Sequence, residues 1–147
     1  YGITVNSVAP GLTETPMLDE MEEDEDDNIL FDADNDPVLI DFQLLGSGTG
    51  AYDVAYFITQ SLTKEDASKY ERELFDRWIA GLQAKGLVVD AEDLWLQYRR
   101  CALFCLAYPV IASRGMDLNN ERERTLIEMM NERFDRAVRE LNLAELM

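Results

Sequence analysis

Apolar residues recur at helical spacing through most of the second part of the chain, and this periodicity limits the fold more than any other feature. Between residues 52 and 141 they repeat every three or four positions in four stretches, which places them along one face of a helix. Before residue 46 the apolar runs are short and flank clusters of Asp and Asn, and "GSGTG" (46–50) reads as a loop. The pattern predicts a mainly α-helical protein with a small β-hairpin.

The first two predicted helices are separated by a capping signal. A short helix is expected over residues 52–62, with Val54, Ala55, Phe57, Ile58 and Leu62 available to the core. Thr63, followed three positions later by Asp66, predicts the start of a second helix, and Gly86 predicts its end. Helical spacing predicts that the inner face of this second helix contains Tyr70, Leu74, Phe75, Trp78, Ile79 and Leu82.

Two further helices are predicted after residue 90. Asp90 marks the start of one, and Pro109 should kink or end it. The last is expected over residues 118–141. On its exposed face Glu132 and Arg136 have the spacing of a weak ion pair.

The charge of the chain is strongly acidic and unevenly distributed. Net charge is −17, and residues 1–63 hold 14 acidic side chains and no lysine or arginine, since Lys64 is the first basic residue. Such a surface repels nucleic acid and anionic lipid, so neither is an expected partner. The chain has no histidine, which excludes imidazole bases and histidine metal ligands. Acid–base or metal chemistry would have to come from carboxylates, amides, tyrosines or water.

Cysteine usage and hydropathy favour a cytoplasmic protein. Cys101 and Cys105 lie four residues apart in a predicted helix, which does not indicate a disulfide framework. The longest apolar run, over residues 101–112, is too short to span a bilayer. The chain begins without an initiator methionine or a basic signal region, and we expect it to be part of something longer.

The stretch "NILFDADNDPVLIDFQ" (28–43) allows more than one interpretation. As a calcium loop it places aspartates at positions one, three and five, but Pro37 stands where a glycine is needed and Gln43 where a bidentate glutamate is needed. As a plain hairpin it explains the Asp and Asn residues of the turn. A plain hairpin does not explain Asp41, which lies between two apolar residues and would be costly to bury alone.

A third interpretation comes from a family resemblance. The segment "NILFDADNDPVLIDFQLLGSGTGAYDVAYF" (28–57) resembles the catalytic segment of the aminoglycoside phosphotransferase-like and choline kinase-like small-molecule kinases. The later stretches "YRRCALF" and "ERFDRAVREL" are similar to the helical lobe of that family, so the resemblance covers roughly 28–147. It implies a protein-kinase-like (α+β) fold, of which this chain would hold the helical C-terminal lobe in truncated form.

The resemblance also implies roles for individual residues. Asn28 and Asp41 would be Mg²⁺ ligands in an ATP-dependent transfer to a small-molecule hydroxyl, and oxygen ligands suit that hard ion. Asp53 would brace the catalytic loop through backbone hydrogen bonds, although an acidic residue in the first turn of a helix is also common for electrostatic reasons.

The chain departs from the family pattern at two points. Glu23 stands where the family has its catalytic aspartate, inside the acidic run "DEMEEDEDD" (19–27). The glycine-rich strand-loop-strand and strand lysine of the nucleotide-binding lobe have no counterpart in this sequence. We therefore expect the chain to be inactive or nearly so by itself, and to need a missing N-terminal lobe or another chain as partner.

The first residues carry a second resemblance. "YGITVNSVAPGLTETPM" (1–17) is similar to a late strand and Pro-Gly segment of the short-chain dehydrogenases/reductases, in which Thr13 and Thr15 would be the nearest candidates for contacting a nicotinamide cofactor. One strand cannot form a dinucleotide site.

The expected organisation is thus a reductase-like strand segment over 1–17, an acidic linker over 18–27 and a phosphotransferase-like helical lobe over 28–147. Two other functions remain open. The chain could be a non-catalytic acidic helical module that binds a partner, or a remnant of an NAD(P)-dependent reductase.

Overall fold

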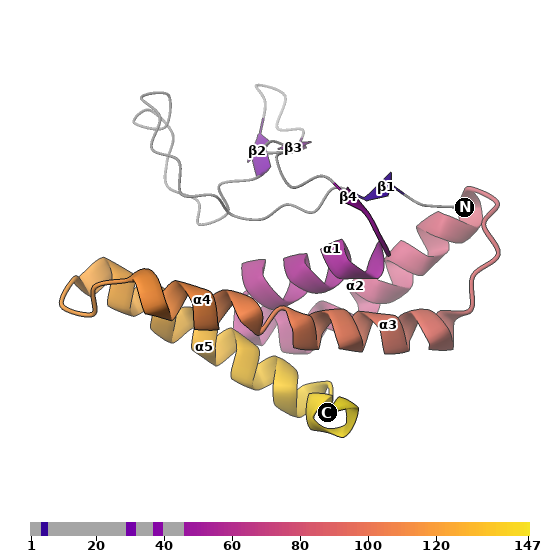
Figure 1. The fold of residues 1–147 in the computed structure, drawn as a ribbon. Coiled ribbons are helices and arrows are strands. Elements are labelled where there is room, and N and C mark those ends of the chain that lie inside the picture. The colour runs from indigo at the N-terminus through magenta and orange to yellow at the C-terminus, as the bar shows by residue number, and fades with distance from the viewer. Residues whose placement is uncertain (1–3, 6–28, 32–36, 40–45) are drawn as a thin grey trace. The chain divides into compact units, whose positions relative to one another are not determined.

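The structure is a computed structural model that describes residues 4–5, 29–31, 37–39 and 46–147. The chain divides into two units, Tyr1–Asp53 and Val54–Met147. Each unit is described by itself below. Figure 1 shows the order of the elements along the chain.

Two short antiparallel strand pairs form the regular structure described in the first unit. Strand β1 (Thr4–Val5) pairs with β4 (Gly46–Ser47), and β2 (Ile29–Phe31) pairs with β3 (Pro37–Leu39). The residues between β2 and β3 lie outside the described ones, so the hairpin turn stays a prediction. The loop predicted over 46–50 is wrong for its first two residues. Their partner strand lies some forty residues earlier, and a local pattern cannot reveal it.

Helices account for the regular structure after Gly50. Helix α1 (Ala51–Tyr56) continues directly into a π-helix (η2, Phe57–Ser61), and α2 (Lys64–Ala84) follows. The predicted capping signals are confirmed. The Asp66 backbone N–H donates to Thr63 Oγ1 at 3.1 Å, and Gly86 ends the helix with a φ of 81° that favours glycine.

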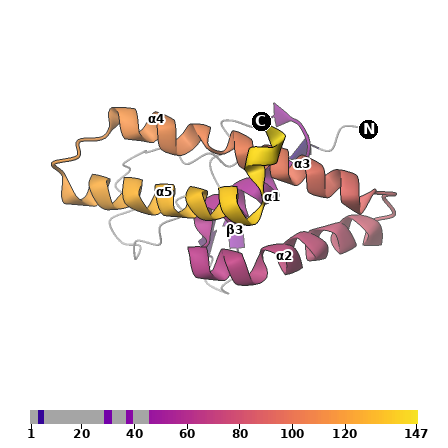
Figure 2. The ribbon, with the colours of Figure 1, turned by 90° about the horizontal axis from the view of Figure 1, so that it is seen from below.

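The second half of the helical unit contains one helix more than the sequence predicts. Helix α3 (Ala91–Phe104) begins at the Asp90 cap, α4 (Ala107–Gly115) is separate, and α5 (Glu121–Glu140) precedes a 3-10 turn (η3, Leu143–Leu146). The predicted effect of Pro109 is confirmed: α3 stops at Phe104, just before Cys105, and Pro109 has no N–H to donate to the Cys105 carbonyl four residues earlier. It lies in the first turn of α4, where its missing N–H has no helical partner to lose. Helix α5 then runs back alongside α4 (Figures 1 and 2).

An aromatic cluster between α2 and α3 forms the centre of the core. Phe75 and Tyr98 are fully buried, with their ring centroids 5.5 Å apart, and Trp95 packs edge-on against Phe75 at 4.8 Å and stacks on Tyr98 at 5.1 Å. Aromatic pairs at these separations add to the stabilisation from burial. The core is completed by Ala102 of α3 and by small and aliphatic residues of the other helical segments, among them Ala55, Ile58, Ile127, Ala137 and Leu143.

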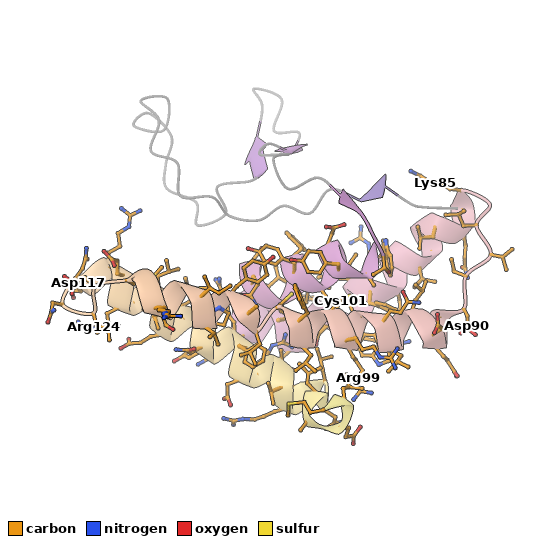
Figure 3. The ribbon with its side chains drawn as sticks, in the orientation of Figure 1. Lys85, Asp90, Arg99, Cys101, Asp117 and Arg124 are labelled. Atoms are coloured by element: carbon orange, nitrogen blue, oxygen red, sulfur yellow. The ribbon has the colours of Figure 1, made fainter. Side chains whose placement is uncertain are left out.

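The C-terminal end is fixed to α3 by one arginine. Arg99 donates from Nε to the Leu141 carbonyl at 2.6 Å and from Nη2 to the Asn142 carbonyl at 2.8 Å. The Leu141 carbonyl lies just past the last turn of α5, and the Asn142 carbonyl also accepts a hydrogen bond from the Glu145 N–H at 3.2 Å. Figure 3 shows Arg99 beside this C-terminal segment.

Three side-chain predictions are wrong. Phe57 and Tyr70 are 40% and 37% exposed. Phe57 starts the π-helix, whose wider turn breaks the 3.6-residue spacing, and Tyr70 lies beside the Ala67–Glu71–Phe75 stripe, not on it. Glu132 pairs with Lys64 at 3.0 Å rather than with Arg136, because Arg136 points into the core.

The helices of the described residues give no candidate for a membrane span, since none combines the length and the apolar character that crossing a bilayer requires.

Candidate functional site

Asp53 is the one predicted site residue that lies within the described part of the chain. Glu23, Asn28 and Asp41 lie outside the described residues, so the structure does not test whether the last two converge on one ion. In the described part of the chain, no three Cys, Asp or Glu side chains come together in a way that could hold a metal. The structure therefore describes only Asp53, the residue predicted to brace the catalytic loop, and the metal ligands stay predictions.

The start of α1 places Asp53 in the first helical turn. The Thr49 hydroxyl accepts a hydrogen bond from the Ala51 backbone N–H at 3.3 Å, and the Thr49 carbonyl accepts one from the Tyr52 N–H at 3.1 Å. A threonine in this position satisfies N–H groups that have no partner inside the helix. The positive end of the helix dipole favours the Asp53 carboxylate there.

The Asp53 carboxylate carries a cost of burial. Its Oδ2 is buried and has no hydrogen-bond partner among the described residues. Burial raises the pKa of Asp53 to about 6, and a hydrogen bond from its own backbone amide opposes that rise. A buried carboxylate oxygen without a donor can still accept a hydrogen bond from another N–H group.

The π-helix after Asp53 is held by side chains from two directions. Thr59 is 1% exposed and donates from Oγ1 to the Ala55 carbonyl at 2.7 Å. Arg133 of α5, itself buried, donates from Nη1 to the Gln60 carbonyl.

The buried Cys105 thiol is not a reactive nucleophile near neutral pH. Burial raises the pKa of Cys105 to about 12, although a hydrogen bond with Thr59 lowers it.

A buried polar network joins α2, α3 and α5, and sequence reasoning missed it. Arg136 Nη1 donates to Glu71 Oε2 at 2.8 Å, and the Tyr98 hydroxyl donates to Glu71 Oε1 at 2.5 Å. The side chains of Arg136 and Glu71 are only 6% and 8% exposed. Burial and the Glu71 charge raise the pKa of Tyr98 well above its usual range.

The position of Glu71 in α2 is the signal that could have revealed this network. Glu71 lies four residues after Ala67 and four before Phe75, in line with the buried face of the helix. A carboxylate at such a position requires a buried cation or hydrogen-bond donors. Since Glu71 is paired with both Arg136 and Tyr98, the network stabilises the fold and offers no free acid or base.

One comparison with known proteins gives a match. A model of the phosphotransferase enzyme family (APH) matches residues 26–99, just over half of the chain. No curated protein and no solved structure matches. The matched range includes Asn28, Asp41 and Asp53, but neither Glu23 nor the reductase-like residues 1–17, so that second resemblance stays a prediction. The chain belongs to the phosphotransferase enzyme family.

Proposed function

We propose that the chain is the helical C-terminal lobe of an ATP-dependent phosphotransferase, with a protein-kinase-like fold, that acts on a small-molecule hydroxyl. The observation that carries this proposal is the family match over residues 26–99. The matched range contains the segment 28–57, where the family resemblance is closest. The mainly helical fold after Gly50 is consistent with such a lobe.

The metal site of this proposal consists of Asn28 and Asp41. An amide oxygen and a carboxylate are the kind of hard donors that Mg²⁺ takes in nucleotide sites, together with water and phosphate oxygens, so the donor set fits the ion. When bound, the ion would offset charge on the triphosphate during transfer. The two side chains would hold and orient the metal–nucleotide complex.

Asp53 would support the catalytic loop. Its buried Oδ2, with no partner among the described residues, supports this role because a loop backbone N–H could donate to it. Glu23 takes the place of the family's catalytic aspartate and would be the candidate base for the acceptor hydroxyl.

Basic groups for the triphosphate would come from outside the first part of this chain, since residues 1–63 contain no lysine or arginine. We therefore propose that a nucleotide-binding lobe or a second chain completes the site, and that the 147 residues have little transferase activity without it. Cys101 and Cys105 form no disulfide within the described part of the chain, which supports a reducing, cytoplasmic location.

Calorimetric titration of the 147-residue chain with ATP tests the proposal. We expect saturable binding in the presence of Mg²⁺, loss of the heat signal when Mg²⁺ is chelated, and loss in Asp41→Asn. The matched control is Asp34→Asn, which removes the same charge from the predicted turn and should bind as the unmodified chain does. Equal binding in both variants would overturn the metal assignment, and a folded chain that gives no heat at millimolar MgATP would rule out phosphotransfer by these 147 residues alone.

The second candidate is a non-catalytic acidic module that binds a partner. The observation that favours it is the net charge of −14 over residues 1–63, which suits a strongly basic partner. Under this candidate the chain does not bind MgATP, and Asp34→Asn and Asp41→Asn weaken binding of a polylysine probe equally and in a salt-dependent way.

A further inference from the structure

We propose that Arg133 of α5 is a positioning residue for Asp53, because it fixes the C-terminal end of the helical segment that begins with α1. The importance of this positioning for function rests on the role proposed above for Asp53. The positioning itself can be tested without any nucleotide.

Asp53 and the Arg133 contact lie on one uninterrupted helical path. Helix α1 spans Ala51–Tyr56 and the π-helix Phe57–Ser61 follows without a break. Asp53 therefore lies near the start of the path, and the Gln60 carbonyl lies seven residues later. A helix transmits a displacement of one end to the other because each turn is hydrogen-bonded to the next.

The end of this path needs an external donor. Leu62 is extended, with φ −80° and ψ 151°, so the carbonyls of the last turn lose their helical partners. Arg133 Nη1 donates to the Gln60 carbonyl, and the arginine is only 9% exposed. A charged donor shielded from water makes a stronger hydrogen bond than a solvated one.

The middle of the path is braced as well. The Thr59 hydroxyl donates back to the Ala55 carbonyl at 2.7 Å, and Gln60 Nε2 donates to Thr59 Oγ1 at 3.2 Å. Ala55 and Ile58 are 0% and 1% exposed, so the segment has little freedom to rotate. π-turns are found frequently at functional sites, and here the π-turn directly follows the helix that carries Asp53.

A purely structural cap makes a different prediction from a positioning residue. If Arg133 only stabilises the protein, its replacement lowers stability and leaves the surroundings of the Asp53 carboxylate as they are. If Arg133 positions α1, its replacement loosens the first turn and lets water reach the Asp53 carboxylate. The Asp53 titration separates the two roles.

The test is a pH titration of the Asp53 carboxyl carbon by NMR in the full 147-residue chain, with Asp53→Asn used to assign the signal. We expect the Asp53 pKa to fall from about 6 toward its ordinary value of 3.8 in Arg133→Met. The matched control is Arg139→Met, an exposed arginine of the same helix that pairs with Asp135, and it should leave the titration unchanged.

If Arg133→Met does not fold, Arg133→Lys provides the test. Lysine retains the charge but not the planar fork, so a smaller fall in the Asp53 pKa is expected. An unchanged Asp53 titration in whichever of the two variants folds would overturn the inference. MgATP titration of the same proteins distinguishes the two proposals. A shifted Asp53 in a chain that never binds MgATP contradicts the function alone, and an unshifted Asp53 in a chain that does bind contradicts the positioning alone.

Discussion

A buried carboxylate of the helical unit and the one at the end of the first unit differ in their hydrogen-bond partners. In the helical unit the Glu71 carboxylate accepts hydrogen bonds from Arg136 Nη1 and from the Tyr98 hydroxyl, although the buried Arg136 Nε has no partner among the described residues. At the end of the first unit, Asp53 buries a carboxylate oxygen that has no hydrogen-bond partner among the described residues. The two buried carboxylates therefore differ. Glu71 has a cation and a hydroxyl as donors, whereas Asp53 Oδ2 has no donor among the described residues.

Breaking the buried ion pair should have the largest effect. Arg136→Met leaves the Glu71 carboxyl group buried without its cation, and we expect it to lower the free energy of unfolding by about 3–5 kcal/mol. The measurement is the urea midpoint at neutral pH. A loss below about 1 kcal/mol would mean that the pair is solvated and not part of the core.

The double variant Glu71→Leu/Arg136→Met is the control for this prediction. Replacing both charged partners by apolar residues of similar size removes the uncompensated charge, so the double variant should be more stable than Arg136→Met alone. Equal or greater destabilisation in the double variant would show that Arg136 acts through packing and not through Glu71.

The tyrosine of the network should have the next largest effect. Tyr98→Phe removes a hydroxyl that donates to Glu71 Oε1 at 2.5 Å and keeps the aromatic packing. The expected loss is about 1.5–3 kcal/mol, typical of a hydrogen bond to a charged group. The check is thermal and urea unfolding, with the far-UV circular dichroism of the helices unchanged. No measurable loss would contradict a buried Tyr98–Glu71 bond.

Replacing Asp53, whose Oδ2 has no hydrogen-bond partner among the described residues, should raise stability and not lower it. The folded pKa of Asp53, about 6, lies above its unfolded value of 3.8, so between these values the folded state binds more protons and stability falls as pH rises. At pH 7 Asp53→Asn should therefore stabilise the chain, by on the order of 1–2 kcal/mol because solvent screens a half-buried charge.

Urea titrations at pH 4 and pH 7 measure this effect of Asp53→Asn. The gain should be present at pH 7 and largely absent at pH 4, since Asp53 is then mostly protonated in the folded state. Asp53→Asn should also weaken MgATP binding if the residue supports the site. A variant that is less stable than the unmodified chain at pH 7 would show that Asp53 is already paired in solution.

A helix cap outside the Glu71 network should give the smallest effect. Asp90 accepts hydrogen bonds from the Glu92 and Asp93 N–H groups at 2.9 and 3.1 Å at an exposed helix start. Asp90→Ala should cost about 1 kcal/mol, independent of the Glu71 network. Additivity with Tyr98→Phe in a double variant is the check, and strong coupling between the two would contradict independence.

Local signals of the sequence predicted the helix boundaries well. Thr63, Gly86 and Asp90 act through contacts within four residues, which a sequence pattern records directly. Pro109 predicted the break at Cys105–Leu106, whereas no sequence signal predicted the π-helix. The β1–β4 pairing was missed because it joins residues distant in sequence.

The candidate site was harder to predict from the sequence than the helix boundaries. The family segment could be read from the chain, and the match over 26–99 confirms the family. The buried roles of Arg133 and Arg136 were hidden because arginines on a helix usually face water. Glu71 on the apolar stripe of α2 was the sign that a buried cation would be needed.

ATP-dependent Mn²⁺ binding tests the central claim most directly. Mn²⁺ takes the same oxygen ligands as Mg²⁺ and is visible by electron paramagnetic resonance. The proposed function predicts one Mn²⁺ bound per chain when ATP is present, lost in both Asn28→Ala and Asp41→Ala and retained in Asp34→Ala. Mn²⁺ binding that is independent of ATP, or that survives in Asn28→Ala and Asp41→Ala, would contradict a phosphotransferase metal site formed by these two residues.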